Sequence, residues 1–343
     1  MFETILLDHG SGGTLTQQLI QNLFVRHFGN DTLNALTDAA LLAMPVGKPA
    51  FTTDSYVVKP LVFPGGNIGK LAVCGTVNDL AVSGARPLYL SAGFILEEGL
   101  PYETLELIVE TMAREAAQAQ VQIVTGDTKV VEKGACDQVF INTAGVGIVE
   151  ESCAHVGTGS QIRAGDKILI NGTIADHGMA VLGKRNELDF STDIVSDCAS
   201  LHELIATALT ASNAAGSGSG IHFMRDATRG GLATVLCELA QQHQIGIELD
   251  EAVIPVHQAV QGLCELLGFD PLYVANEGKA VLVVDSDAAD AVLDALRRHP
   301  LGVRSAIIGT IADIHPGRVV LHTSVGGKRL VDMLSGAQLP RIC

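Results

Sequence analysis

Hydrophobic and polar residues alternate along the chain in a way that predicts regular helices and strands. After residue 13, Leu15, Leu19 and Leu23 recur at helical spacing, and Gly29 ends the predicted helix. Short runs rich in branched apolar residues predict strands. In the first half of the chain we expect strands at 50–58, 87–96, 121–125 and 138–149, helices at 68–83 and 103–118, a turn at 64–66 and a loop at 126–129.

The second half continues the same alternation. Strands are expected at 166–171, 245–249, 280–285, 306–311 and 318–321, and helices at 176–183, 199–210, 230–242, 256–267 and 288–299. Because strands and helices alternate throughout, the chain is predicted to have an α/β (α+β) layer structure.

The chain is long enough for two domains. A segment rich in Gly, Ser and Thr at 151–161 marks the expected boundary between them. We therefore predict an N-terminal domain at 1–155, a C-terminal α/β domain at 156–331 and a mobile tail at 332–343. The tail shows no periodicity, and fully extended it would reach roughly 40 Å, enough to cross to a neighbouring subunit.

Composition narrows the possible classes of protein. Hydrophobic residues make up 47% of the chain and charged residues 17%, so buried cores are expected and disorder is not. The formal net charge of −16 argues against nucleic-acid binding, because phosphate backbones would be repelled. We find no apolar stretch that would span a membrane and no signal-peptide pattern. The odd number of cysteines, without a C-x-x-C pair, argues for a reducing compartment, so the expected location is the cytoplasm.

Several aspartates stand at predicted strand ends and at junctions between loops and helices. Carboxylates there are suitable ligands for Mg²⁺, which prefers oxygen and is often shared with substrate phosphates. A single aspartate in such a place also caps a helix or forms a turn. Asp79 is harder to explain in that way, because a lone carboxylate in an apolar helix is costly. The candidate metal ligands are Asp38, Asp54, Asp79, Asp127 and Asp226.

Two glycine-rich stretches, 10–13 and 229–231, come before predicted helices. Backbone N–H groups at a helix N-terminus favour phosphate oxygens, and glycine lets the backbone come close. Neither stretch is a Walker A loop or a dinucleotide-binding fingerprint, so an ordinary turn is the alternative. Lys129 and Arg229 lie next to candidate aspartates and suit either a phosphate contact or a plain salt bridge.

Other segments hold candidate catalytic groups. Asn276 and Glu277 precede the strand predicted at 280–285, so Glu277 could be a base and Asn276 a hydrogen-bond donor, or the segment could be a turn. His177, at a helix start, is either a proton acceptor or a capping or packing residue. Cys343 ends the chain, where a thiol is either incidental or a swinging nucleophile that carries a group into a site.

A series of short motifs runs the length of the chain. In order, they are His9–Gly13, Thr53–Ser55, Pro64–Lys70, Asn78–Ala85, Gly126–Val131, Asp226–Gly231, Ala275–Lys279 and Pro340–Cys343. Together they resemble the HypE family of hydrogenase-maturation carbamoyl dehydratases. That family belongs to the superfamily of aminoimidazole ribonucleotide synthetase, selenophosphate synthetase and thiamine-monophosphate kinase. The aspartate motifs point to the superfamily, and the terminal motif points to HypE.

The resemblance implies a two-domain synthetase-superfamily fold, in which the N-terminal domains of two subunits pair into a β-barrel-like homodimer. ATP is expected between the N- and C-terminal domains. Asp38, Asp54, Asp79 and Asp226 match positions where the superfamily holds Mg²⁺, and Asp127 lies at a position where relatives vary. The matched nucleotide-binding positions are Gly12, Gly13, Asn78, Thr128, Lys129, Arg229 and Asn276.

The resemblance also implies a reaction and its partners. A carbamoyltransferase, HypF, loads a carbamoyl group onto Cys343, and ATP then phosphorylates the carboxamide oxygen. Loss of phosphate and of the nitrogen protons leaves a thiocyanate, and the cyanide is passed to iron on a HypC–HypD complex. Glu277 and His177 are the candidate proton acceptors.

Two alternatives remain beside this hypothesis. Selenophosphate synthetase, or another ATP-dependent synthetase, is the nearest within the superfamily, but the stretch 10–13 lacks the Cys and Lys that selenophosphate synthetase requires. The other is a non-catalytic, nucleotide-gated carrier that only presents Cys343 to its partners.

Overall fold

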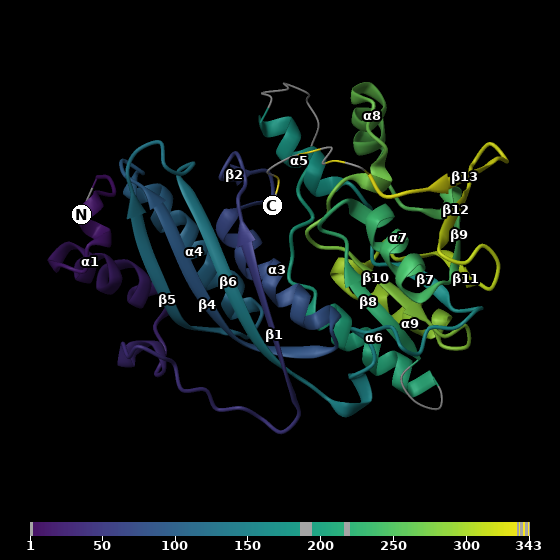
Figure 1. Cartoon of the computed structure of the whole chain (residues 1–343), viewed down its shortest axis with the longest axis horizontal. Helices are drawn as coiled ribbons and strands as arrows, with labels where there is room; N and C mark the ends of the chain where they lie inside the picture. The colour runs from purple at the N-terminus through teal and green to yellow at the C-terminus, as the bar shows by residue number, and fades with distance from the viewer. Residues whose placement is uncertain are drawn as a thin grey trace.

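The computed structural model describes residues 3–185, 194–215 and 220–334, together with Gly336, Leu339 and Ile342. Two layered halves lie side by side along the long axis of the molecule (Figure 1). Each half is built on its own sheet. Within the described part, no helix is long and apolar enough to cross a membrane.

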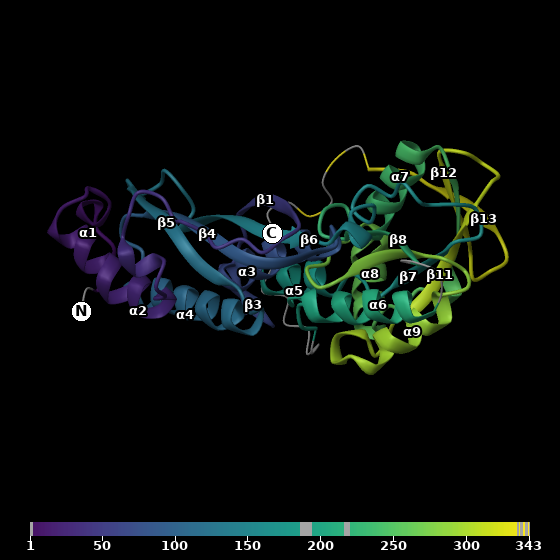
Figure 2. The same ribbon diagram turned by 90° about the horizontal axis from the view of Figure 1, so that it is seen from below.

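The N-terminal half contains a four-stranded mixed sheet with two helices on one face (Figure 2). β1 pairs antiparallel with β6, β6 antiparallel with β4, and β4 parallel with β5. The sheet is open in the single chain, with β1 and β5 as its two edges. The elements are β1 (Lys48–Tyr56), α3 (Ile68–Val82), β4 (Ala85–Glu97), α4 (Tyr102–Gln118), β5 (Gln122–Val131) and β6 (Val139–Val149).

Helix α3 is buried on nearly every side, because it lies between the N-terminal sheet and the second half of the chain. Only Lys70 and Asp79 of its fifteen residues are not buried. The Asn67 side chain caps the helix by accepting hydrogen bonds from the backbone N–H groups of Gly69 and Lys70. At Gly75 a side chain would collide with the Tyr56 hydroxyl, so glycine allows the helix to approach β1 closely.

The predicted N-terminal helix is present, and it packs against the β5 side of the sheet. It comprises α1 (Thr14–Leu19), a π-helical stretch (Ile20–Val25) and α2 (Arg26–Phe28), and it ends before Gly29 as predicted. Phe24 anchors it, because its ring lies 4.9 Å from the ring of Phe94 on β4.

The loop predicted at 126–129 is wrong: these residues belong to β5. Glycine and aspartate favour turns in isolation, but parallel pairing with β4 overrides that preference here. Asp127 pairs with Gly93, and the register shifts nearby, between Leu90 and Ser91. Gly126 lies where a side chain would collide with the Ala92 carbonyl oxygen, so glycine is what permits this close pairing.

The C-terminal half contains a seven-stranded sheet covered by helices on both faces. Alternate residues of its buried strand β10 enter separate apolar clusters: Val281 and Val283 pack with α7, and Leu282 and Val284 pack with α6 and α9. Burial on both faces explains why this strand is apolar throughout. The strands are β7 (Lys167–Ile170), β8 (Ile221–Asp226), β9 (Gly246–Asp250), β10 (Ala280–Val284), β11 (Ala306–Ala312), β12 (Arg318–His322) and β13 (Lys328–Val331).

The helices of this half match the predicted ones within a few residues. They are α5 (Asp176–Arg185), α6 (His202–Ala215), α7 (Gly231–His243), α8 (Gln258–Leu267) and α9 (Ala289–Arg298). Two strands were missed. β8 carries polar His222 and Arg225 among its apolar residues, and β13 is four residues long, so neither shows a clear apolar run.

The C-terminal end of the chain returns to the junction between the two halves (Figure 1). Ile342 is buried, with 5% of its surface exposed, in the core cluster of the N-terminal half. Leu339 packs against the same cluster. The structure thus gives the predicted tail one docked position, and its mobility stays a prediction. Cys343 lies outside the described residues.

Candidate active site at the junction of the two halves

Three of the predicted carboxylates meet at the junction. Asp54 lies on β1, Asp79 on α3 and Asp226 at the end of β8. Burial, followed by repulsion from Asp79 and then Asp54, raises the pKa of Asp226 to about 7. Burial also raises the pKa of Asp79, although a hydrogen bond from Thr52 partly opposes that change. A site in which carboxylates repel one another in this way has a strong electrostatic preference for cations.

Arg229 joins this cluster from the C-terminal half. Its guanidinium group donates a hydrogen bond of 2.7 Å to Asp54, so the pair connects β1 to the loop before α7. Thr52 donates a hydrogen bond of 2.8 Å to Asp79. The predicted pairing of Arg229 with a candidate aspartate is therefore present.

The remaining predicted carboxylates, Asp38 and Asp127, are not part of this cluster within one chain. Asp38 is exposed in an irregular segment. Asp127 is on β5, where its carboxylate lies 3.6 Å from the Lys129 ammonium group. Because β6 and β4 separate β5 from β1, the two edges are about 14 Å apart. Within one chain, three of the five predicted aspartates therefore meet and two lie elsewhere, and metal binding by all five stays a prediction.

The glycine-rich loop lies on the β5 side as well. Gly10 packs closely against Val130 of β5. Gly12 has a positive φ of 84° and donates its N–H to the Thr16 hydroxyl, and Gly13 is the N-cap residue of α1. Beside this loop is a cavity of about 290 Å³, whose lining includes Thr16, Phe24, Leu36, Asp127 and Thr128. The predicted nucleotide-binding positions therefore form two groups, one at β5 and one at the junction.

Two predicted nucleotide-binding amides hold loops together in this structure. Asn78 accepts a hydrogen bond from Leu201 N–H and donates to the carbonyl groups of Ala199 and Glu277. Asn276 bonds in the same manner with the backbone at 175, 227 and 274. All the N–H donors of both side chains are engaged by the protein, and nucleotide binding by these amides stays a prediction.

Glu277 is a buried acid close enough to Asp226 and Asp54 to be repelled by both. Its side chain is nearly inaccessible, and its Oε1 atom has no hydrogen-bond partner among the residues that the structure describes. Burial, then repulsion from Asp226 and Asp197, raises its pKa well above the usual value. Burial thus favours the neutral form of this acid, which becomes a strong proton acceptor when it ionises.

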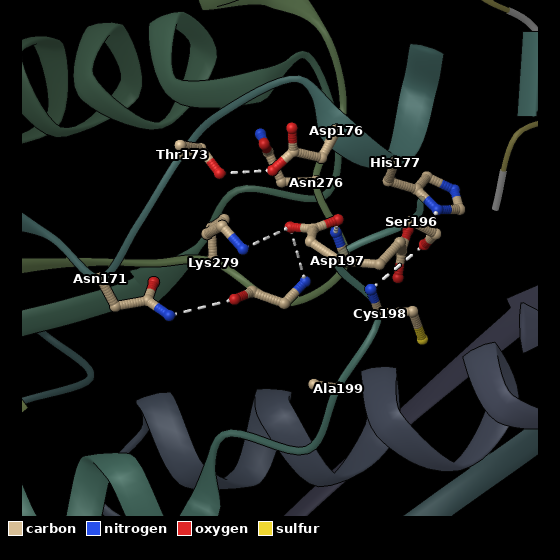
Figure 3. Close-up of polar contacts among 12 residues, drawn as sticks. Asn171, Thr173, Asp176, His177, Ser196, Asp197, Cys198, Ala199, Asn276 and Lys279 are labelled. Atoms are coloured by element: carbon tan, nitrogen blue, oxygen red, sulfur yellow. Dashed lines mark hydrogen bonds and ion pairs between the residues drawn. The ribbon is translucent and has the colours of Figure 1, made fainter. Parts of the chain in front are cut away.

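Asp197 organises this loop, and no pattern in the sequence pointed to it. Its carboxylate accepts hydrogen bonds from the N–H groups of Glu277 and Gly278, and it forms a buried ion pair of 3.1 Å with Lys279 (Figure 3). Burial disfavours its charge, but Lys279 and these hydrogen bonds outweigh that effect and lower its pKa. The ionised Asp197 carboxylate therefore holds the backbone of Glu277 in place.

His177, the other predicted proton acceptor, lies on the far side of this loop and is completely buried. Its Nδ1 atom is 2.8 Å from the Ser196 hydroxyl, and its Nε2 atom is 2.6 Å from the Ile342 carbonyl oxygen. Burial lowers its pKa, so the ring is neutral near pH 7. The structure thus brings His177 to the C-terminal end of the chain.

Two buried thiols lie next to Glu277, in Cys74 and Cys198. A hydrogen bond with Cys74, followed by burial, raises the pKa of Cys198 well above its usual value. Cys198 is therefore a protonated core thiol and a poor nucleophile. No disulfide forms among the described cysteines.

Among the described residues, one group brings three ligand-type atoms within 4.8 Å of one another: His27, Glu106 and Glu110. This group lies on α2 and α4, away from the junction, and one of its carboxylates is exposed. The three junction aspartates do not converge as closely. A cation held there would need oxygen atoms from phosphate and water as well.

Each half of the chain matches a known family model. The N-terminal domain of AIR synthase related proteins matches residues 36–149, and the C-terminal domain of the same proteins matches residues 163–322. The interval between the two matches contains the domain boundary predicted at 155/156.

Individual relatives match over nearly the whole chain. The carbamoyl dehydratase HypE of Bradyrhizobium diazoefficiens is 54% identical over 98% of this chain and 95% of its own length. A crystal structure of the hydrogenase maturation protein HypE in complex with ATP superposes with a TM-score of 0.94, at 48% identity, over 99% of this chain and all of that one. A HypE–HypF complex superposes with a TM-score of 0.79, at 47% identity, over 92% of this chain and 99% of that one.

Proposed function

Because the chain belongs to the AIR synthase-related family and, within it, to the HypE carbamoyl dehydratases, we propose that it uses ATP to dehydrate a carbamoyl group carried on Cys343. The product is a thiocyanate, which supplies the cyanide ligand of a hydrogenase iron. The observation that carries the proposal is the docked position of Ile342. It shares an apolar cluster with Ala275, which lies two residues before Glu277.

The junction aspartates fit Mg²⁺. Mutual repulsion among Asp54, Asp79 and Asp226 is relieved when a divalent cation binds, and carboxylates are the ligands that this ion prefers. These three residues would hold it, and Arg229 would contact phosphate oxygens. When bound, Mg²⁺ and ATP provide the phosphoryl group that converts the carboxamide oxygen into a leaving group.

Glu277 is the proposed acceptor of the nitrogen proton. Its high pKa makes it a strong base when ionised, and neutralisation of nearby Asp226 favours that ionised form. Its Oε1 atom has no competing hydrogen-bond partner in the described part of the chain. The buried surroundings also exclude water, which would otherwise hydrolyse the activated group.

A second copy of the chain would unite the two groups of predicted nucleotide-binding residues. Asp54 is on edge strand β1, and Asp127 with Lys129 is on the opposite edge strand, β5. In a symmetric homodimer that pairs the N-terminal sheets, the β5 edge of one subunit can approach the β1 edge of the other. The glycine-rich loop and Asp38 would then reach the site from the partner subunit.

Complementation between variants tests this shared site. When ATP is kept well below saturation, Asp226→Asn and Lys129→Ala chains are each expected to lose most activity, because each damages one part of every site. After the two are unfolded and refolded together, half of the dimers contain both chains and one intact site, so activity should recover to about a quarter of the wild-type value. No recovery in mixed dimers would show that one chain supplies both parts.

Partners follow from the same proposal. HypF would load Cys343, in line with the solved complex of a relative with HypF, and a HypC–HypD complex would receive the cyanide. Both encounters require Cys343 outside the buried site, whereas dehydration requires it inside. The tail must therefore move between steps.

Mass spectrometry of the C-terminal peptide tests the reaction itself. After carbamoylation and addition of ATP and Mg²⁺, the loaded peptide should lose the mass of one water. Cys343→Ala should abolish product formation while ATP binding is retained. An unchanged carbamoyl mass would instead identify a nucleotide-gated carrier.

Selenophosphate synthesis is the less favoured alternative. The loop 10–13 contains neither the Cys nor the Lys that this activity requires, and the relatives matched over the full chain are HypE proteins.

A further inference from the structure

We propose that His177 is a positioning residue, which holds the C-terminal tail in its docked state through the hydrogen bond to the Ile342 carbonyl oxygen. Dehydration would depend on this bond, and loading of Cys343 would require that it break. The link to dehydration and loading rests on the function proposed above, whereas the role of His177 in holding the tail does not.

The hydrogen-bond partners fix which ring nitrogen carries the proton. A carbonyl oxygen only accepts, so Nε2 must donate to Ile342. The N–H of Cys198 donates to the Ser196 oxygen at 3.1 Å, which leaves the Ser196 hydroxyl proton for Nδ1 of His177. The neutral ring is therefore an acceptor at Nδ1 and a donor at Nε2. Each donor and acceptor in this series of three hydrogen bonds has a partner.

This arrangement separates positioning from proton transfer. In the docked state, the Nδ1 lone pair is engaged by Ser196, and Nε2 already carries its proton. The ring therefore has no free site with which to accept a proton from a substrate. Of the two candidate proton acceptors, Glu277 is the one with an unpaired oxygen atom.

The surroundings of the ring keep it in one orientation. Phe63 packs edge to face against it, at 5.5 Å between centroids and 85° between planes. The ring is fully buried, so its hydrogen bond is shielded from water. A rigid, shielded donor is suited to select one position of the Ile342 backbone.

The tail contributes apolar contacts on both sides of this bond. Ile342 is buried with Val181, Cys198 and Ala275. Leu339 packs over Gly178, where any side chain would press on it. These contacts favour docking of the tail. Apolar contacts are not directional, however, so they do not by themselves determine which peptide group of the tail lies beside His177. The hydrogen bond from His177 to the Ile342 carbonyl oxygen determines this, because it fixes the peptide group that precedes Cys343.

Release of the C-terminal dipeptide by trypsin measures docking directly in the full chain. Trypsin cleaves after Arg341, and Ile342 must leave its pocket to enter the protease. Loss of one buried hydrogen bond in His177→Ala should raise the release rate on the order of tenfold. Intact-mass spectrometry would follow this release, and circular dichroism would confirm that the variant is folded.

Matched variants separate positioning from general damage. His177→Gln keeps a donor and an acceptor and should restore slow release in part. His155→Ala removes a different histidine that bonds a backbone carbonyl, that of Ile221, and should leave the rate unchanged. A folded His177→Ala chain that releases the dipeptide as slowly as wild type would overturn the proposal.

The two half-reactions supply a second readout. In His177→Ala, dehydration of a loaded tail should slow about tenfold, whereas loading by the carbamoyltransferase should be as fast as in wild type or faster. If His177 were instead the base, Ala and Gln variants would both lose dehydration with unchanged dipeptide release. If the chain does not dehydrate at all, the proposed function fails while the release assay still decides whether His177 holds the tail.

Discussion

The junction and the β5 edge each contain an aspartate–lysine pair, and the two pairs differ in surroundings. Asp197 and Lys279 have side chains that are 3% and 10% exposed, and the carboxylate also accepts two backbone hydrogen bonds. Asp127 and Lys129 are 72% and 66% exposed and have no such support. The same chemistry is therefore structural in one place and available to a ligand in the other. Burial, more than residue type, separates the two roles.

The largest expected effect is on catalysis at the junction. Glu277→Gln keeps the size of the side chain but removes the proton acceptor, so the dehydration rate should fall between about a hundredfold and ten-thousandfold. ATP binding should be unchanged, because the three aspartates are intact. Single-turnover dehydration and nucleotide titration would measure the two separately. A variant that retains full thiocyanate formation would exclude Glu277 as the base.

The two ion pairs should respond very differently to truncation. Asp197→Ala leaves Lys279 buried without its partner and should lower the free energy of unfolding by about 3–5 kcal/mol. Asp127→Ala should lower it by less than about 0.5 kcal/mol. Urea denaturation of both variants would measure the contrast. Equal losses of stability in the two variants would contradict the conclusion that only the buried Asp197–Lys279 pair is structural.

Asp226 should make the metal-free protein less stable as pH rises. Its pKa is near the usual 3.8 in the unfolded chain and about 7 in the folded one, so the folded state binds the proton more tightly. The resulting penalty is absent below pH 4, grows up to about pH 7 and amounts to at most about 4 kcal/mol above it.

Denaturation of the metal-free chain at pH 5 and pH 8 would measure this penalty. Asp226→Asn should show a smaller difference between the two pH values, whereas Asp127→Asn at the β5 edge should behave like wild type. Mg²⁺ with ATP should restore stability to wild type at pH 8 but not to Asp226→Asn. Identical pH dependence in wild type and Asp226→Asn would contradict the assigned burial of this carboxyl group.

The smallest expected effect is at the β5 edge. Lys129→Ala should leave stability within about 0.5 kcal/mol of wild type, because the pair is exposed. If the β5 edge contacts phosphates of a nucleotide, the apparent affinity for ATP should weaken about tenfold. Calorimetric titration with ATP in high salt and low salt would show whether this contribution is electrostatic. Unchanged affinity would leave the β5 edge outside the site.

The sequence predicted local structure well and long-range placement less well. The helix predicted at 288–299 is strongly amphipathic and lies within one residue of α9 at each end, because its apolar spacing is visible in the segment itself. The loop at 126–129 became strand because β4 supplies its hydrogen bonds. That pairing depends on residues more than thirty positions away, which no local pattern encodes.

The candidate site shows the same limit. The motifs correctly brought Asp54, Asp79 and Asp226 together, but could not show that Asp127 lies on the opposite edge strand or that Asp38 lies in an exposed irregular segment. Asp197 gave no signal, because an isolated aspartate in an irregular segment looks like any turn residue. The role of His177 toward Ile342 depends on a contact between residues 165 positions apart.

Helix α3 has a consequence for how the chain can be divided. Its residues Leu80 and Ala81 pack in one cluster with Leu204 and Leu282 of the C-terminal half. A fragment ending at residue 155 would turn this buried surface toward water and should aggregate or stay partly unfolded. We therefore expect the two halves to unfold as one cooperative unit, and neither to be stable when expressed alone.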